Sequence, residues 1–285
     1  MNIGRRMTLG FAFLIAFTCV LGVISFTQIS NMDQQYSDLA NVDSIAMEMM
    51  NDMKFHMDYA LREMWEYLGG DTSHQREEII LAAEEFDEHA EELKVLLPEF
   101  TVEIDELETH HEEIMEFILN GTEGVLAHQD EILGHINIIF GLHEHIDEDI
   151  DLLLGVIEDP VMDLNASLMK MCIAEQMLFV YEYISNQDVQ TRNEFNTSLE
   201  LFDTCIDNIA TFYVGNTTIE NILLEIETHH ANFSNLAIEP GHGVFDDYDT
   251  LQNDISNINI TADALVTDLD ALDLEVDSHI EANKA

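Results

Sequence analysis

The feature that most constrains this chain is an uncharged, apolar run near its N-terminus. Positions 7–32 contain no Asp, Glu, Lys or Arg, and Arg5 and Arg6 directly precede the run. A bilayer core needs only about 20 apolar residues in a helix, whereas a cleaved signal peptide has a shorter core that ends in an Ala-x-Ala-like site. Because basic residues favour the cytoplasmic side, we predict a cytoplasmic tip and a lipid-contacting transmembrane helix over residues 1–32, with the rest extracytoplasmic.

Acidic residues dominate the chain after this run. The sequence has 58 Asp and Glu residues, all after position 32, against nine Lys and Arg, and its formal net charge is −49. Phosphate contacts need a basic surface, which excludes a nucleic-acid-binding protein. Self-repulsion of this size destabilises a compact state unless salt screens it, so the composition favours a halophilic or otherwise high-salt host.

Apolar residues at helical spacing fill the rest of the chain, between clear helix breakers. Gly69-Gly70, Pro98, Asn120-Gly121 and Gly155 divide the first half into four segments. Each segment is long enough for an amphipathic helix, and these breakers are typical of helix ends. The first half therefore predicts four helices.

After Pro160 the sequence repeats itself, first at an offset of 116 residues and then at an offset of 119. The matching segments are Met53-Lys54 with Met169-Lys170, Phe86-Asp87 with Phe202-Asp203, and Glu108-Thr-His-His111 with Glu227-Thr-His-His230. Duplication of a four-helix unit predicts an all-α fold of two tandem four-helix bundles, over residues 33–156 and 157–285.

The N-terminal phrase Met1-Asn-Ile-Gly-Arg-Arg-Met-Thr-Leu-Gly-Phe resembles the start of prokaryotic chemoreceptors (methyl-accepting chemotaxis proteins) and related sensor kinases. The Asn41-Val-Asp43 segment and the Trp65-Glu-Tyr67-Leu68-Gly69 turn are similar to those of their four-helix-bundle ligand-binding domains, and the doubled length resembles their helical bimodular variants. The resemblance implies an extracytoplasmic sensor, usually dimeric, in which a small ligand shifts helices and so signals across the membrane. Within these 285 residues no second membrane helix, HAMP linker or signalling hairpin follows, so a truncated receptor and a stand-alone relative both remain open.

Basic and aromatic residues at repeat-equivalent positions are the candidates for a small-molecule site. They are Lys54, Arg62, Arg76, Lys170, Arg192, Tyr67 and Tyr183. Between helices they would hold a carboxylate- or amine-bearing ligand. The alternative is ion pairing of the basic groups with neighbouring carboxylates, and core packing of the tyrosines.

Two Glu-x-x-His pairs have the spacing of the metal ligands in di-iron carboxylate bundles. Glu108 and His111 form one pair, and Glu227 and His230 form the other. Di-iron proteins converge both pairs in one core, whereas here each copy carries one. We therefore expect a polar structural face in preference to a metal site.

The fourth helix of the first copy carries four more histidines, which we expect to be solvated. They are His128, His135, His143 and His145. The chain has no Gly-rich phosphate loop, nucleophile elbow or Cys-x-x-Cys motif. We therefore expect no enzyme activity, catalytic residue or cofactor. The alternatives to a sensor are a structural acidic surface or stalk protein and a metal-binding bundle.

The repeat also relates two cysteines to two histidines. At an offset of 116, His56 corresponds to Cys172 and His89 to Cys205. Equivalent positions that change together are expected to touch, and an extracytoplasmic compartment permits oxidation. We predict a Cys172–Cys205 disulfide in the second copy, and in the first copy a His56–His89 pair that is stacked or shares a proton. The alternative is two free cysteines that behave as small hydrophobes.

Overall fold

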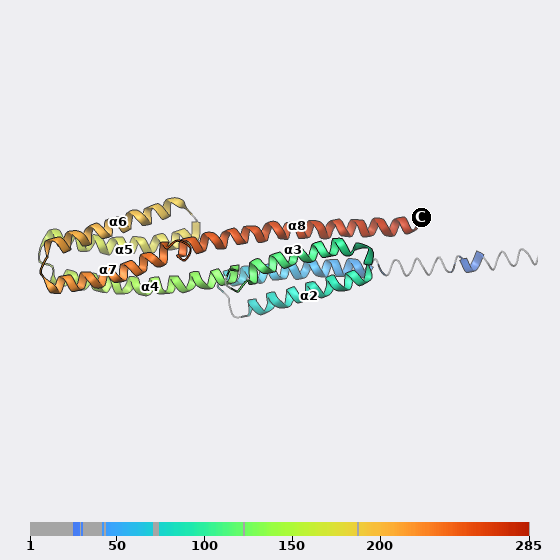
Figure 1. Cartoon of the computed structure of the whole chain (residues 1–285), viewed down its shortest axis with the longest axis horizontal. Helices are drawn as coiled ribbons and strands as arrows, with labels where there is room; N and C mark the ends of the chain where they lie inside the picture. Colours follow the sequence, from blue (N-terminus) through green and yellow to red (C-terminus); the bar gives the residue numbers. More distant parts are fainter. Residues whose placement is uncertain are drawn as a thin grey trace, which may run out of the picture. The chain divides into compact units, whose positions relative to one another are not determined.

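The computed structural model describes residues 25–28, 30, 42, 44–70, 74–121, 123–186 and 188–284. Every regular element in these segments is a helix, which confirms the predicted all-α fold (Figure 1). The predicted anchor over residues 7–32 lies almost entirely outside the described residues. Within the part of the chain described, no helix combines the length and apolar character that crossing a bilayer requires.

The helices follow the breakers read from the sequence. The first described long helix covers residues 44–68 and ends at Gly69-Gly70, and the positive φ of 100° at Gly70 suits glycine. The later elements are α2 (Gln75–Leu96), the 3-10 turn η1 (Pro98–Phe100), α3 (Thr101–Leu119), α4 (Val125–Val156), α5 (Pro160–Asn186), α6 (Val189–Phe212), α7 (Thr217–Ile238) and α8 (Val244–Lys284).

The chain forms two compact units, and neither is continuous in sequence. The described part of the first unit comprises residues 25–28, 30, 42, 44–63, 77–112 and 262–284. One apolar face of each of its helices is buried. Representative core residues are Met53, Met57, Phe86, Leu93, Ile104, Leu265 and Leu269.

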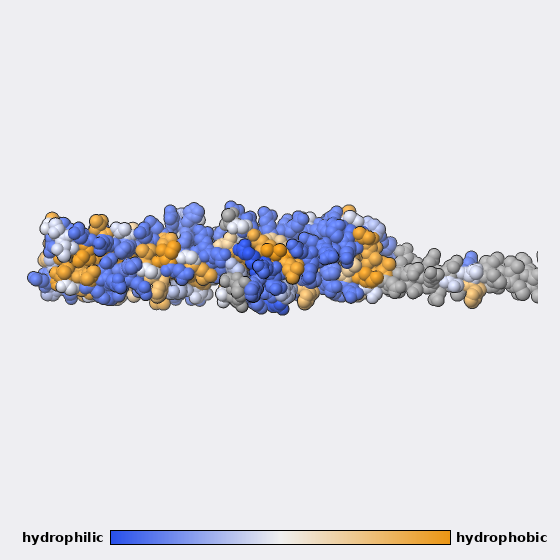
Figure 2. Space-filling view, turned by 90° about the horizontal axis from the view of Figure 1, so that it is seen from below, coloured by the Kyte–Doolittle hydropathy of each residue, from blue (hydrophilic) through white to orange (hydrophobic). Residues whose placement is uncertain are grey.

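The second unit comprises residues 64–76 and 113–261. Here α5 packs on α6, α4 packs on both α7 and α5, and α6 also contacts α7. Its core is rich in aromatic rings, and the ring of Phe195 contacts those of Phe233 and Phe245. The surface contrasts with these apolar cores: in the view of Figure 2 it is largely hydrophilic, and apolar residues form separate patches on it.

These units differ from the predicted modules over residues 33–156 and 157–285. The predicted fourth helix of the first module, α4, packs on helices of the second copy, and the continuous helix α8 contributes residues 244–261 to the second unit and 262–284 to the first. A heptad pattern identifies the apolar face of a helix but not the helices that cover it. The sequence therefore could not reveal which copy each fourth helix completes.

Repeat-equivalent contacts show that the later parts of the two fourth helices are exchanged between the copies. The equivalent ion pairs are Lys54–Asp270 (2.6 Å) with Lys170–Asp151 (2.7 Å), and His110–Asp268 (3.2 Å) with His229–Asp149 (3.0 Å). In each pair the basic residue comes from one copy and the aspartate from the other. Each copy's fourth helix thus packs on the first and third helices of the other copy.

Candidate functional site

A cavity of about 1010 Å³ lies within the second unit. It is bounded by the last turns of α3, the start of α4, the α7–α8 turn and the first half of α8. Its walls are strongly acidic, and none of the described residues that line it is Lys or Arg. The charged and titratable lining residues are Glu113, Glu116, Glu123, His128, Glu131, His242, Asp247 and Asp254.

Two equivalent glycine turns position the helices that form this cavity. The N–H of Gly124 donates to the carbonyl of Asn120 at 2.9 Å, and the N–H of Gly243 donates to the carbonyl of Glu239 at 2.8 Å. A Cβ atom at either glycine would lie 2.7 Å from a backbone nitrogen, closer than real contacts allow. Glycine therefore lets α4 and α8 begin tightly against the preceding helices.

Histidines of α4 face aspartates of α8 beside the cavity, and three of these four residues, His128, Asp247 and Asp254, line it. His128 Nε2 lies 4.0 Å from Asp254 Oδ2, and His135 Nδ1 lies 3.5 Å from Asp247 Oδ2. All four side chains are less than a fifth exposed, so the prediction that His128 and His135 are solvated was wrong. The helix α8 covers them, and the sequence of α4 alone could not show this.

The repeat relation makes this contact pseudo-symmetric. At the offset of 119, His128 corresponds to Asp247 and His135 corresponds to Asp254. The two starts of the fourth helices thus meet through the same two positions, filled by histidine in one copy and by aspartate in the other. A comparison of the two fourth helices at this offset would have indicated the pairing from sequence.

Burial raises the pKa values of the two aspartates that line the cavity, Asp247 and Asp254. Burial raises the pKa of Asp247, and Glu131 raises it further, while His135, His128 and His242 oppose the shift. Burial likewise raises the pKa of Asp254. A cation bound in the cavity would offset the cost of ionising these carboxyl groups.

The seven predicted ligand-binding residues lie outside the lining of this cavity. Each basic group among them forms an ion pair with a carboxylate. The pairs are Lys54–Asp270 (2.6 Å), Arg62–Glu63 (2.9 Å), Arg76–Asp130 (4.0 Å), Lys170–Asp151 (2.7 Å) and Arg192–Asp246 (2.6 Å). These contacts fit the alternative interpretation, in which the basic residues neutralise neighbouring acids.

The two predicted tyrosines make equivalent contacts in the two copies. The hydroxyl of Tyr67 donates to Asp130 and that of Tyr183 donates to Asp249, both at 2.6 Å. Burial raises the pKa of Tyr183 to about 12, with a further contribution from its aspartate partner. Both hydroxyls are therefore used in tying the first helix of a copy to the start of its fourth helix.

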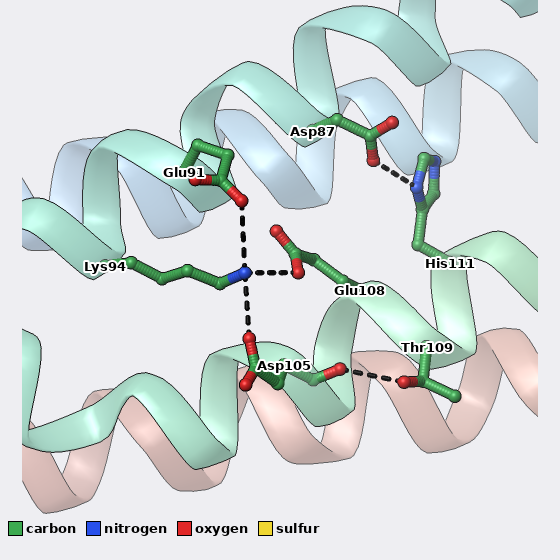
Figure 3. A network of polar contacts seen from close by, with 7 residues as sticks. All are labelled: Asp87, Glu91, Lys94, Asp105, Glu108, Thr109 and His111. Carbon is green, nitrogen blue, oxygen red and sulfur yellow. Dashed lines mark hydrogen bonds and ion pairs between the residues drawn. The ribbon is translucent and has the colours of Figure 1, made fainter.

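The predicted metal-ligand pair of the first copy is engaged in structural contacts (Figure 3). Glu108 shares the Lys94 ammonium with Asp105 and Glu91. His111 stacks on Phe86, with ring centroids 3.9 Å apart, and its Nδ1 lies 2.9 Å from Asp87.

The second pair, Glu227 and His230, lies in the other compact unit, so the two pairs do not share one core. His230 repeats the stacking on Phe202 at 3.7 Å, and its Nε2 lies 3.0 Å from Gln176 Oε1. Burial lowers the pKa of His230 to about 4. Both residues line a groove of about 420 Å³ together with Asp203 and Asp207.

The predicted Cys172–Cys205 disulfide is not formed, since both cysteines are buried free thiols. Burial raises the pKa of each thiol, which disfavours the reactive thiolate. The two cysteines therefore pack as small apolar groups. The predicted contact between the equivalent residues of the first copy is confirmed, because the rings of His56 and His89 stack with their centroids 5.5 Å apart.

Comparison with known protein families indicates a class of function for part of the chain. Residues 1–94 match the four helix bundle sensory module for signal transduction. This match confirms the predicted likeness to chemoreceptor sensory domains over the first third of the chain, and it favours a sensory over a catalytic role. No match to the chain was found among curated proteins.

The matched sensory segment ends within α2. It covers the helix over residues 44–68, whereas every residue that lines the acidic cavity lies beyond it. What the cavity binds must therefore be argued from its own chemistry.

Proposed function

We propose that this chain is the extracytoplasmic sensory part of a chemoreceptor-type membrane receptor, and that it binds a small cationic molecule in the acidic cavity of the second unit. The observation that carries the proposal is the cavity, with six carboxylate side chains and neither Lys nor Arg among its described lining residues. Its volume of about 1010 Å³ suffices for a small organic ligand. Charge complementarity favours an amine or another organic cation over a carboxylate ligand.

The helices around the cavity offer a route for the signal. His128 and Glu131 belong to α4, whereas Asp247 and Asp254 belong to α8. A ligand that contacts both helices stabilises one arrangement of them over another. Because α8 continues without a break to Lys284, a small displacement at the cavity is carried along one stiff element.

The proposal also includes membrane anchoring and dimerisation through the N-terminal region. The apolar run over residues 7–32 anchors the chain in lipid, with Arg5 and Arg6 on the cytoplasmic side. The chain associates as a homodimer through this anchor and the helix over residues 44–68, where Phe55 and Trp65 are exposed. The acidic surface keeps nucleic acid from being a partner.

Thermal unfolding of the full-length chain in detergent micelles tests the ligand class. The panel comprises primary amines, quaternary ammonium compounds, guanidinium compounds and organic carboxylates, all with EDTA present so that metal ions take no part. We expect a cation to raise the unfolding midpoint. The free energy of unfolding should rise with the logarithm of the cation concentration above its Kd, by about 2.7 kcal/mol at a concentration 100 times the Kd.

The matched control is the variant Glu113→Gln/Glu116→Gln/Asp254→Asn, which keeps the shape of the cavity and removes three negative charges. We expect the cation to lose its effect on this variant. If no cation stabilises the wild type, or if carboxylates stabilise it instead, the proposal is wrong. Lack of any ligand effect would favour the structural surface or stalk protein.

A further inference from the structure

Three side chains on the wall of the cavity converge in the manner of a metal site. His128, Glu131 and Asp247 each offer one ligand atom, and these atoms all lie within 4.8 Å of one another. Two of them stand three residues apart on α4, so they share one face of that helix. The third comes from the first turn of α8.

Several buried polar atoms in this three-residue cluster and in the adjacent His135 have no hydrogen-bond partner. They are Asp247 Oδ2, His128 Nδ1 and His135 Nδ1. Asp247 is only 4% exposed. Its distance of 3.5 Å to His135, and the 4.0 Å from His128 to Asp254, are too long for good hydrogen bonds. Buried polar groups are almost always satisfied, so the unpaired oxygen of the buried Asp247 carboxylate indicates a species bound at the cluster.

We propose that His128, Glu131 and Asp247 bind a divalent first-row transition metal ion, for which Zn²⁺ is the probe. One imidazole nitrogen and two carboxylate oxygens form a donor set that suits such ions. Magnesium and calcium prefer sites made of oxygen atoms alone. His135 Nδ1 lies 3.5 Å from the Asp247 carboxylate, in the position of an outer partner of this metal ligand.

The ion joins the fourth helices of the two sequence copies. The positions of His128 and Asp247 are equivalent in the duplication. The duplication therefore supplies two different ligands, histidine from one copy and aspartate from the other. The inference does not rest on the proposed sensory function, because a metal clamp between α4 and α8 would form in a purely structural protein too.

Calorimetric titration of the metal-stripped full-length chain in micelles with Zn²⁺ tests the site. Molar salt and excess Mg²⁺ occupy and screen the many surface carboxylates. We expect one saturable site per chain. The near-isosteric variants His128→Gln, Glu131→Gln and Asp247→Asn should each weaken Zn²⁺ binding by at least about 10-fold.

The variant Glu113→Gln/Glu116→Gln is the matched control, since it alters the same cavity outside the three-residue cluster. It should leave the Zn²⁺ affinity unchanged. Visible absorption of the Co²⁺-loaded chain gives a second readout, because its spectrum reports the ligands directly and should change in His128→Gln. The proposal is overturned by absence of a one-per-chain site, by variants that bind like the wild type, or by equal weakening in the control. It is separable from the proposed function, whose ligand screen contains EDTA.

Discussion

His230 should make the second unit sensitive to acid. The ring is 5% exposed, stacks on Phe202 and contacts Gln176. Burial lowers its pKa from 6.5 to about 4. Between these values the unfolded chain holds the proton on this histidine, whereas the folded chain does not.

The sign of the effect follows from this difference in bound protons. Because the unfolded state binds more protons in that window, the full contribution of His230 to stability is present above pH 6.5 and is lost as the pH falls toward about 4. The difference between the two pKa values corresponds to about 3 kcal/mol of unfolding free energy, lost over the whole range from above pH 6.5 to below about pH 4. About 2 kcal/mol of this is lost between about pH 7.5 and about pH 5.

Denaturant unfolding of the wild type and of His230→Leu at these two pH values measures the effect. Acid also relieves repulsion among the carboxylates, so the informative quantity is the difference between the variants. The loss of stability on acidification should be about 2 kcal/mol smaller in His230→Leu than in the wild type. Phe233→Leu, a buried neighbour without a titrating group, should lose stability at both pH values and keep the wild-type pH dependence. A pH dependence of His230→Leu equal to that of the wild type would refute the reasoning.

Three further predictions concern charge and backbone packing. The thermal midpoint followed by circular dichroism should climb from low to molar salt, because 58 acidic residues face nine basic ones; a flat or falling midpoint would contradict this. Lys94→Met should destabilise the chain by about 2 kcal/mol in denaturant unfolding, since Glu91, Asp105 and Glu108 lose their shared cation. Lys54→Met, whose partner Asp270 is 65% exposed, should cost less than about 1 kcal/mol, and equal costs would count against the argument. Gly124→Ala should destabilise by about 1–3 kcal/mol because its Cβ meets backbone atoms at 2.7–2.8 Å. Gly134→Ala, where the Cβ meets open space, should instead stabilise α4 by about 0.5–1 kcal/mol, and the same sign for both would be inconsistent with the turn geometry.

The helices could be predicted from sequence because their ends are set by local chemistry. As expected, Gly69-Gly70 ends the helix over residues 44–68, α2 ends at Leu96 just before Pro98, and Pro160 begins α5. Repeat-equivalent pairs also behave alike, as the matching contacts of Tyr67 and Tyr183 show. These features could be predicted because they depend only on residues close in sequence or on the internal duplication.

The exchange of the fourth helices and the acidic cavity depend on contacts between distant segments. The apolar faces of α4 and α8 fit either copy equally well by pattern, so the sequence predicted two self-contained bundles. His128 and His135 stand in an acidic helix and look solvated until α8 is placed beside them. The available signal was the pairing of histidine and aspartate at equivalent positions of the duplication.

Binding of a metal-free organic cation to the acidic cavity tests the central claim most directly. The measurement is a calorimetric titration of the full-length chain in micelles with spermidine, at molar salt and with EDTA, for the wild type and for Glu113→Gln/Glu116→Gln/Asp254→Asn. The account predicts one saturable spermidine site per wild-type chain, which the variant loses. Spermidine binding that does not saturate at one per chain, or that the variant retains in full, would contradict it.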